Sequence, residues 1–187
     1  FDPHTPYIPP PDYVPPFVPG VREALKLNRT IFLYDVLLAY TDREIGNLLN
    51  GLDQRGLTPD TLVVVTGDHG EGLMNHGHMF HGVHIYEEGV RVPFIARWPG
   101  RIPAGVVNPG PVRMIDIAPT VLDLAGVSAE PALQGPSLAS VLMGSGDLDA
   151  ERPVHLYRRR YAGGEVVEGV YAEGEKFGLR RGRWKLI

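Results

Sequence analysis

Cysteine is absent from the 187 residues, and so are other features that would define a class of protein. Without cysteine the chain has no disulfide, no thiolate metal site and no cysteine nucleophile, while the redox compartment remains open. The net charge of -4 gives no sign of a basic surface that would bind phosphates, so we expect no nucleic-acid partner. No run approaches the ~20 apolar residues of a membrane-spanning helix, so we expect no membrane span.

The chain begins with neither an initiator methionine nor a signal-like segment, because Phe1–His4 lacks a basic and an apolar region. We therefore expect an excised or truncated piece of a longer protein. The composition that remains is ordinary for a globular protein, with 43% hydrophobic and 21% charged residues. This length allows one domain, or one domain and a small lobe, with a sizeable core.

The first half of the chain changes from proline-rich to helical. Residues 1–20 hold eight prolines, which excludes helix and central strand. Two interpretations stay open for them: a polyproline linker, or an ordered wall that positions His4. Residues 22–52 carry apolar groups at i, i+3, i+4 and i+7, which predicts an amphipathic helix that ends at Arg55-Gly56.

Strands and helices alternate through the middle of the chain, and strands cluster at the end. Thr61–Val65 is rich in β-branched residues, which predicts a fully buried, parallel strand. A helix should begin at Asp116 and end at Gly126. The other predicted strands are Val92–Arg97, Pro153–Tyr157, Glu165–Tyr171 and Phe177–Ile187, the last bent into a hairpin at Arg181-Gly182. This order predicts an α/β sheet with a small antiparallel lobe.

Asp68 and His69 directly follow the first predicted strand. Ligands of open α/β sheets bind beyond the carboxyl ends of strands, and both residue types are good metal ligands. Gly67 and Gly70 flank the pair and give a ligand room to approach. The alternative is a loop aspartate that caps a helix beside an incidental histidine. The buried strand before the pair, Glu71 after it and the histidines beyond it favour a metal site.

Histidines are concentrated after this pair, with five of the chain's seven lying between His69 and His84. Neutral imidazoles at the spacing of His76, His78 and His81 could bind zinc, or they could hold an anionic substrate. Solvated loop histidines are the remaining alternative, above all for His78 and His84. We expect Glu87-Glu88 to form exposed helix-end charges that pair locally with Arg91.

Several motifs in the chain occur together in one family. They are T-G-D-H-G-E, two H-G steps, Y-E-E-x-x-R-V-P and W-P-G within Thr61–Gly100, D-P-H-T-P-Y at Asp2–Tyr7, Tyr34-Asp35 with Tyr40-Thr41-Asp42, Asp116–Gly126, Gln134–Leu138 and Arg183–Ile187. In this order the motifs resemble the sulfatase family of the alkaline phosphatase superfamily. The resemblance implies an alkaline-phosphatase-like sandwich, an incomplete mixed sheet flanked by helices, with a small C-terminal antiparallel lobe.

The resemblance also implies roles for single residues. Asp68 would ligate a divalent cation, Ca²⁺ before Mg²⁺ or Zn²⁺, and could take the proton of a hydrated formylglycine nucleophile. His69 falls at the position of the last metal ligand. His4 and His81 would contact the sulfate and assist the leaving oxygen. This set is chemically coherent, because a cation and two imidazoles would surround an anion whose leaving oxygen gains charge.

Two parts of the family's site are not in this sequence. Neither the C-x-P-S-R or S-x-P-x-R motif that yields formylglycine nor the early aspartate pair occurs here. The resemblance therefore assigns residues 1–150 to the C-terminal part of the catalytic domain and 151–187 to the start of the small antiparallel subdomain. We expect formylglycine in the missing N-terminal region. We also expect these residues alone to be inactive and to bind metal weakly.

The predicted function is that of a sulfuric ester hydrolase acting on a small-molecule or carbohydrate sulfate ester. A phosphodiester or phosphonate monoester hydrolase of the same superfamily is one alternative, and a non-catalytic anion- or glycan-binding remnant is another. The resemblance favours a periplasmic or secreted location. Tyr13, Phe17 and Arg158–Arg160 are either pocket residues or ordinary surface groups, and neither the substrate nor the oligomeric state follows from the sequence.

Overall fold

The structure is a computed structural model that describes residues 3–16, 29–128, 130–167 and 170–187. The chain divides into two compact units, Phe1–Thr61 and Leu62–Ile187. Within the described ranges, no helix combines the length and the apolar character needed to cross a membrane.

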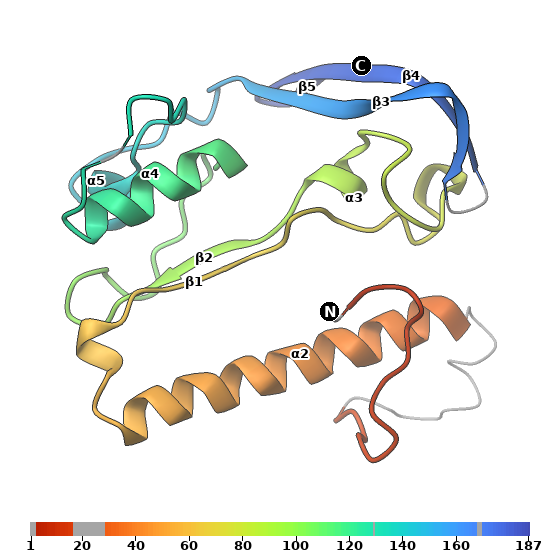
Figure 1. The fold of residues 1–187 in the computed structure, drawn as a ribbon. Coiled ribbons are helices and arrows are strands. Elements are labelled where there is room, and N and C mark those ends of the chain that lie inside the picture. The colour runs from red at the N-terminus through yellow and green to blue at the C-terminus, as the bar shows by residue number, and fades with distance from the viewer. Residues whose placement is uncertain (1–2, 17–28, 129, 168–169) are drawn as a thin grey trace. The chain divides into compact units, whose positions relative to one another are not determined.

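A single long helix, α2 (Arg29–Gln54), dominates the first unit (Figure 1). It confirms the predicted helix from Arg29 onward, while residues 22–28 of that prediction lie outside the described residues. The helix ends as predicted, because Gly56 takes a φ of 67° and its N–H donates to the carbonyl of Asp53. The short 3₁₀ helix η1 (Thr58–Asp60) follows it.

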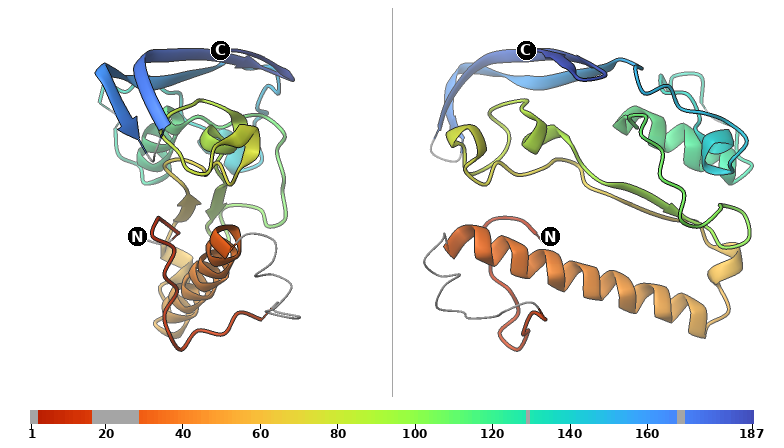
Figure 2. Two further views of the ribbon diagram at one scale, coloured as in Figure 1. Left: turned by 90° about the vertical axis from the view of Figure 1, so that its right-hand side faces the viewer. Right: turned by 180° about the vertical axis from the view of Figure 1, so that it is seen from behind.

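The proline-rich segment packs along α2 and contains neither helix nor strand in residues 3–16 (Figure 2). Tyr7 is buried and meets Tyr34 edge-on, with ring centroids 5.5 Å apart. Tyr13 meets Tyr40 in the same way at 5.3 Å. These contacts favour the ordered wall over the linker for the described part of the segment. Phe17 lies outside the described residues.

The second unit begins with a two-stranded ribbon. Strand β1 (Val63–Thr66) pairs with β2 (Phe94–Arg97) in antiparallel register, with Val63 opposite Arg97. The prediction of a fully buried, parallel strand was wrong, since β1 is only partly buried and its one partner among the described residues runs antiparallel. A β-branched run indicates a strand, but it does not specify the direction of the strand beside it.

Helix α4 (Met114–Leu124) begins two residues before the predicted start and ends before Gly126, whose φ is 71°. Asp116 lies in its first turn, where the backbone N–H of Arg113 donates to Oδ2 at 2.9 Å. A carboxylate in this position satisfies a backbone donor and interacts favourably with the helix dipole. Residues 116–126 are therefore helical almost as predicted, but Asp116 caps the helix rather than starting it.

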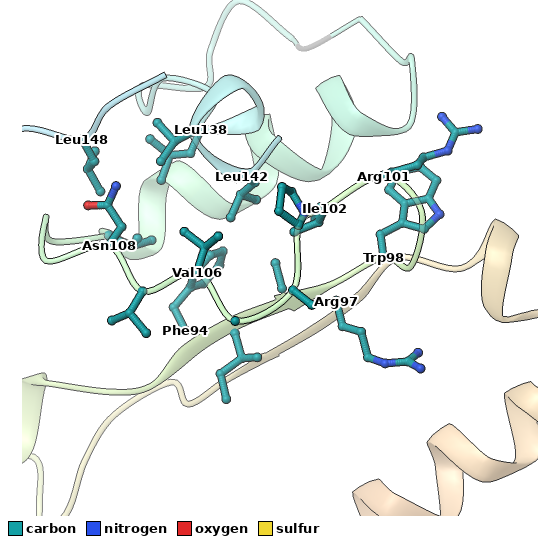
Figure 3. A pocket seen from close by; sticks show the side chains of 18 of the residues that line it. Phe94, Arg97, Trp98, Arg101, Ile102, Val106, Asn108, Leu138, Leu142 and Leu148 are labelled. Atoms are coloured by element: carbon teal, nitrogen blue, oxygen red, sulfur yellow. The ribbon is translucent and has the colours of Figure 1, made fainter. Parts of the chain in front are cut away.

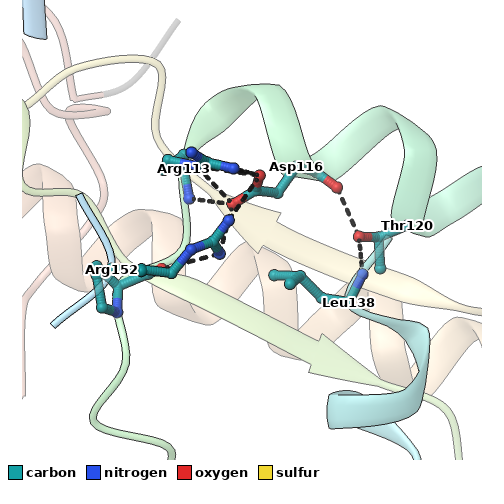
Figure 4. A network of polar contacts seen from close by, with 6 residues as sticks. Arg113, Asp116, Thr120, Leu138 and Arg152 are labelled. Carbon is teal, nitrogen blue, oxygen red and sulfur yellow. Dashed lines mark hydrogen bonds and ion pairs between the residues drawn. The ribbon is translucent and has the colours of Figure 1, made fainter. Parts of the chain in front are cut away.

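Asp116 joins α4 to the chain that leads into the C-terminal sheet (Figure 4). Its side chain is fully buried, and it accepts hydrogen bonds from the guanidinium groups of Arg113 and Arg152, each at 2.9 Å at the closest. Thr120 then links α4 to the short helix α5 (Ala139–Leu142), because the N–H of Leu138 donates to its Oγ1 at 2.9 Å.

A cavity of about 1170 Å³ lies beside β2, the loop that follows it and α5 (Figure 3). Its lining is mainly apolar, and none of the predicted site residues belongs to it. The candidate site must therefore lie elsewhere. The lining side chains that carry hydrogen-bonding groups are those of Arg97, Trp98, Arg101 and Asn108.

A three-stranded antiparallel sheet closes the second unit, with β3 (Val154–Val167), β4 (Val170–Arg181) and β5 (Trp184–Leu186) in that order. The predicted hairpin at Arg181-Gly182 is confirmed by the pairing of Arg181 with Trp184. The predicted strand Glu165–Tyr171 was wrong, because this range holds the end of β3 and the start of β4. Glu165 and Tyr171 therefore belong to two different strands of one long hairpin.

This sheet lies against the loop that carries α3 (Glu87–Val90), as Figure 1 shows. Val83 packs with Tyr161 and Ala172 in a small buried cluster, and the Tyr161 hydroxyl donates to the carbonyl of Gly82 at 3.0 Å. Lys185 of β5 donates to Glu87 at 3.0 Å. The C-terminal sheet therefore supports the histidine-rich loop from one side.

Candidate active site

Asp68 and His69 lie in the turn directly after β1. The Asp68 side chain is 88% exposed, and its Oδ1 accepts the backbone N–H of His69 at 3.0 Å. Nδ1 of His69 lies 2.9 Å from the carbonyl oxygen of Gly70, which can only accept, so Nδ1 carries the proton. In that tautomer Nε2 holds the ring's lone pair, as a metal ligand requires.

Two glycines allow close approaches of the backbone, Gly70 to α3 and Gly72 to the loop before it. A Cβ on Gly70 would stand 2.0 Å from the carbonyl oxygen of Glu88, and the Gly70 N–H donates to the carbonyl of Gly89 at 3.0 Å. A Cβ on Gly72 would stand 2.4 Å from the carbonyl oxygen of His78. Glycine is required at both positions because only a residue without a side chain allows these approaches.

His81 returns to the turn and stacks on His69, with ring centroids 3.8 Å apart and an interplanar angle of 22°. Its Nδ1 lies 3.2 and 3.3 Å from the two carboxylate oxygens of Glu71. The Glu71 side chain is only 5% exposed, and that of His81 is 18% exposed. The structure therefore brings together Asp68, His69 and His81, three of the four predicted site residues.

The chain between these residues has an unusual backbone. Leu73, Met74 and His76 all have positive φ, near the short 3₁₀ helix η2 (Asn75–Gly77). Residues other than glycine rarely adopt a positive φ, and those that do are concentrated at functional sites. His76 is held by a 2.7 Å contact with Glu88 and by stacking on Tyr86 at 4.3 Å.

Glu87 and Glu88 lie in the first turn of α3 as predicted, and Glu87 is 44% exposed, but the pairs that they form are not with Arg91. Glu88 is only 16% exposed and contacts His76, while Glu87 pairs with Lys185 of the sheet. Burial alone would raise the pKa of Glu88, but its backbone hydrogen bond and His76 together hold that pKa below its usual value. The two glutamates therefore connect distant segments of the loop and the sheet.

His78 and His84 are packed side chains rather than solvated ones. Their ring centroids are 3.8 Å apart, and Nζ of Lys176 on β4 lies 3.2 Å from Nδ1 of His84. Burial, followed by the charges of His78, Lys176 and Arg158, lowers the pKa of His84 to about 4. His84 is therefore neutral at pH 7, which allows the lysine to donate to its ring.

Two atoms fit a divalent cation. Oδ1 of Asp68 and Nε2 of His69 are 3.8 Å apart, a separation that one ion can bridge at ordinary ligand distances. The exposed carboxylate and the fixed imidazole tautomer also suit this role. The carboxylate oxygen of Asp68 is a ligand that Ca²⁺ and Mg²⁺ prefer, whereas the imidazole nitrogen of His69 is a ligand that Zn²⁺ prefers.

His4 belongs to the first unit, where its Nδ1 lies 2.7 Å from the carbonyl oxygen of Thr5. Its predicted role therefore stays a prediction. Sequence reasoning missed the pairing of Glu71 with His81, which spans ten residues of irregular loop. The only signal was an acidic residue two positions after His69, and acidic residues in loops are common.

Solved structures define the class of protein to which this fold belongs. One solved structure is that of a protein in complex with its substrate D-glucosamine-2-N,6-O-disulfate. That protein is 31% identical to this chain, with a TM-score of 0.71, and the match covers 83% of this chain and 31% of the other. A phosphonate monoester hydrolase from Silicibacter pomeroyi is 29% identical to this chain, with a TM-score of 0.67. The match covers 82% of this chain and 31% of the hydrolase chain. The fold is therefore the alkaline-phosphatase-like α/β fold that the resemblance predicted.

Family comparison then makes the assignment specific. The chain matches the sulfatase family over residues 2–127, and the C-terminal region of N-sulphoglucosamine sulphohydrolase over residues 75–187. It is 35% identical to arylsulfatase K of Mus musculus over 154 residues, which are 82% of this chain and 27% of that protein. The chain belongs to the sulfatase family and spans about a quarter of the length of this relative.

Proposed function

We propose that the whole protein containing this chain hydrolyses sulfate esters, with sulfated carbohydrates as the substrate class. The observation that carries the proposal is the sulfatase match over residues 2–127, within which Asp68, His69 and His81 are neighbours. The related structure that holds a disulfated glucosamine supports the choice of a carbohydrate. A periplasmic or secreted location accompanies this proposal as a prediction.

Asp68 and His69 are the proposed metal ligands of this chain, with Ca²⁺ as the expected ion. A bound cation would polarise the sulfate group and favour its attack by a nucleophile. The expected nucleophile is a formylglycine outside this chain. The Asp68 carboxylate is exposed and could also accept a proton from that group.

His81 and His4 are the proposed partners of the leaving oxygen. An imidazole titrates close to neutral pH, so it can hold or deliver a proton as negative charge develops. His81 is suited to this role because its ring is fixed on one side by His69 and at Nδ1 by Glu71. The corresponding role of His4 rests on its place in the D-P-H-T-P-Y motif.

Substitution in the whole protein tests the assignment. Asp68→Ala should abolish hydrolysis of a sulfated glucosamine and lower the bound metal measured by elemental analysis. His81→Ala should lower kcat by about 10²- to 10⁴-fold, the usual effect of removing a general acid or base. Asp147→Ala is a matched control, because this aspartate is also exposed but lies in another loop. Normal turnover in Asp68→Ala would refute the assignment.

A phosphonate monoester hydrolase is the second candidate, because a protein of that name has the same fold at 29% identity. Both activities would place an anion beside the same cation and imidazoles. Assays of the whole protein with a sulfate monoester and a phosphonate monoester of the same alcohol would separate them. A higher kcat/KM for the phosphonate would replace the leading proposal by this one.

A further inference from the structure

The loop between His69 and Gly89 contains two contacts between a carboxylate and an imidazole, and the two differ in burial. The Glu88 pair joins a histidine that is 59% exposed to a glutamate that is 16% exposed. The Glu71 pair joins a histidine that is 18% exposed to a glutamate that is 5% exposed. Burying a carboxylate is costly unless it is hydrogen-bonded, so the Glu71 pair calls for a specific explanation.

The contact between Glu71 and His81 indicates which nitrogen of His81 carries a proton. A carboxylate can only accept, so the contact at 3.2 Å requires the proton on Nδ1. The stacking of His81 on His69 at 3.8 Å restrains the plane of the same ring. Together these contacts fix the proton on Nδ1 and restrain the plane of the ring, so a proton that His81 exchanges with a substrate would have to be carried at Nε2.

We propose that Glu71 is a positioning residue for His81 in the hydrolysis of the substrate ester. This inference rests on the proposed function, and it assigns to Glu71 a task that acts only through the imidazole. The same carboxylate accepts the N–H of Gly72 at 3.3 Å, which holds it in the loop. A charged, buried acceptor fixes a ring tautomer in a way that an apolar residue of equal volume cannot.

The first arm of the test reads the ring directly and needs no substrate. In the whole protein with ¹⁵N-labelled histidine, the chemical shift of His81 should show a proton on Nδ1. Glu71→Gln should weaken this preference, because an amide can either accept from or donate to Nδ1. A spectrum of the unsubstituted protein with Nδ1 unprotonated would overturn the inference, whatever the substrate proves to be.

The second arm is kinetic and separates positioning from simple support of the loop. Glu71→Gln should lower kcat by roughly 10-fold with little change in KM, a typical effect of removing such a partner. In a His81→Lys background the same change should lower kcat by less than about twofold, because lysine has no tautomer to fix. Glu88→Gln, which disturbs the other pair, is the matched control and should leave kcat unchanged.

The outcomes distinguish this inference from the proposed function. Equal losses from Glu71→Gln in both backgrounds, or losses matched by Glu88→Gln, would overturn the positioning role and indicate support of the loop. Absence of sulfate ester hydrolysis in the unsubstituted protein would refute the proposed function alone. The proton on Nδ1 would then still decide whether Glu71 fixes the His81 ring.

Discussion

Gly70 directly follows Asp68 and His69 in the sequence, and its backbone lies close to the carbonyl oxygen of Glu88. A Cβ at this position would be 2.0 Å from that oxygen, so the backbone would have to move. The same backbone carries the two proposed metal ligands and the acceptor for Nδ1 of His69. A change at Gly70 should therefore affect both folding and the geometry of the site.

Gly70→Ala should lower the free energy of unfolding by about 1–3 kcal/mol, as overpacking does elsewhere. Gly46→Ala is the control, because nothing lies within 4 Å of its Cβ and glycine weakens a helix interior. That control should raise the free energy of unfolding by about 0.5–1 kcal/mol. Urea denaturation measures both, and an unchanged midpoint for Gly70→Ala would contradict the close approach.

Single residues of the site were predictable to different degrees. Asp68 and His69 could be located from the strand before them and the glycines around them, although their chemistry stays a prediction. The stacking of His81 on His69 depends on a tight loop with positive φ at Leu73 and Met74, which no local pattern indicates. Glu71 was visible only as an acidic neighbour, because its partner is set by tertiary structure.

Among the elements, α4 is connected by one buried carboxylate to the chain segment that leads into the C-terminal sheet. Asp116 is fully buried and accepts hydrogen bonds from both Arg113 and Arg152. Asp116→Ala would leave two partly buried guanidinium groups without this partner, so it should lower the free energy of unfolding by roughly 3–5 kcal/mol. Thermal or urea unfolding of the variant measures the loss, and a loss close to zero would contradict a structural role.

The same contact predicts a dependence on pH. Burial works to raise the pKa of Asp116, but Arg113 and Arg152 hold that pKa below its usual value. Below about pH 4 the unfolded chain therefore binds more protons at this group than the folded chain, and stability falls as pH falls. Asp116→Asn should flatten this fall in a series of urea unfolding curves below about pH 4, relative to the unsubstituted protein.

The kinds of element were easier to predict than their pairing. Helix α2 and its end at Gly56 follow from apolar periodicity and a glycine stop, both local properties. The direction of the partner of β1 and the long β3–β4 hairpin depend on contacts between distant residues. Glu165–Tyr171 has the composition of a strand, and composition alone does not show that its two ends belong to different strands.

At the scale of the whole molecule, the chain corresponds to only part of the length of its relatives, and this limits the activity that we expect from the chain alone. The chain spans 27% of arylsulfatase K of Mus musculus, and it contains no cysteine and no S-x-P-x-R motif. Asp68 supplies one oxygen ligand and His69 one nitrogen ligand to the proposed site, whereas Ca²⁺ takes about 6–8 ligands in proteins, typically oxygens. The domain boundary proposed at residue 150 also concerns this larger protein and stays a prediction.

The 187-residue chain, expressed by itself, should therefore hydrolyse no sulfate ester, and calcium should bind to it far more weakly than to the whole protein. Two ligands in an exposed turn gain little over water, because a cation that keeps most of its hydration shell is held by few protein contacts. Calorimetric titration of both proteins with Ca²⁺, together with an assay on a sulfated glucosamine, measures the difference.

The chain must first be shown to be folded, by circular dichroism, since unfolding would also abolish binding. Turnover by the folded chain at a rate comparable to the whole protein would show that its own residues, without a formylglycine, complete a catalytic site.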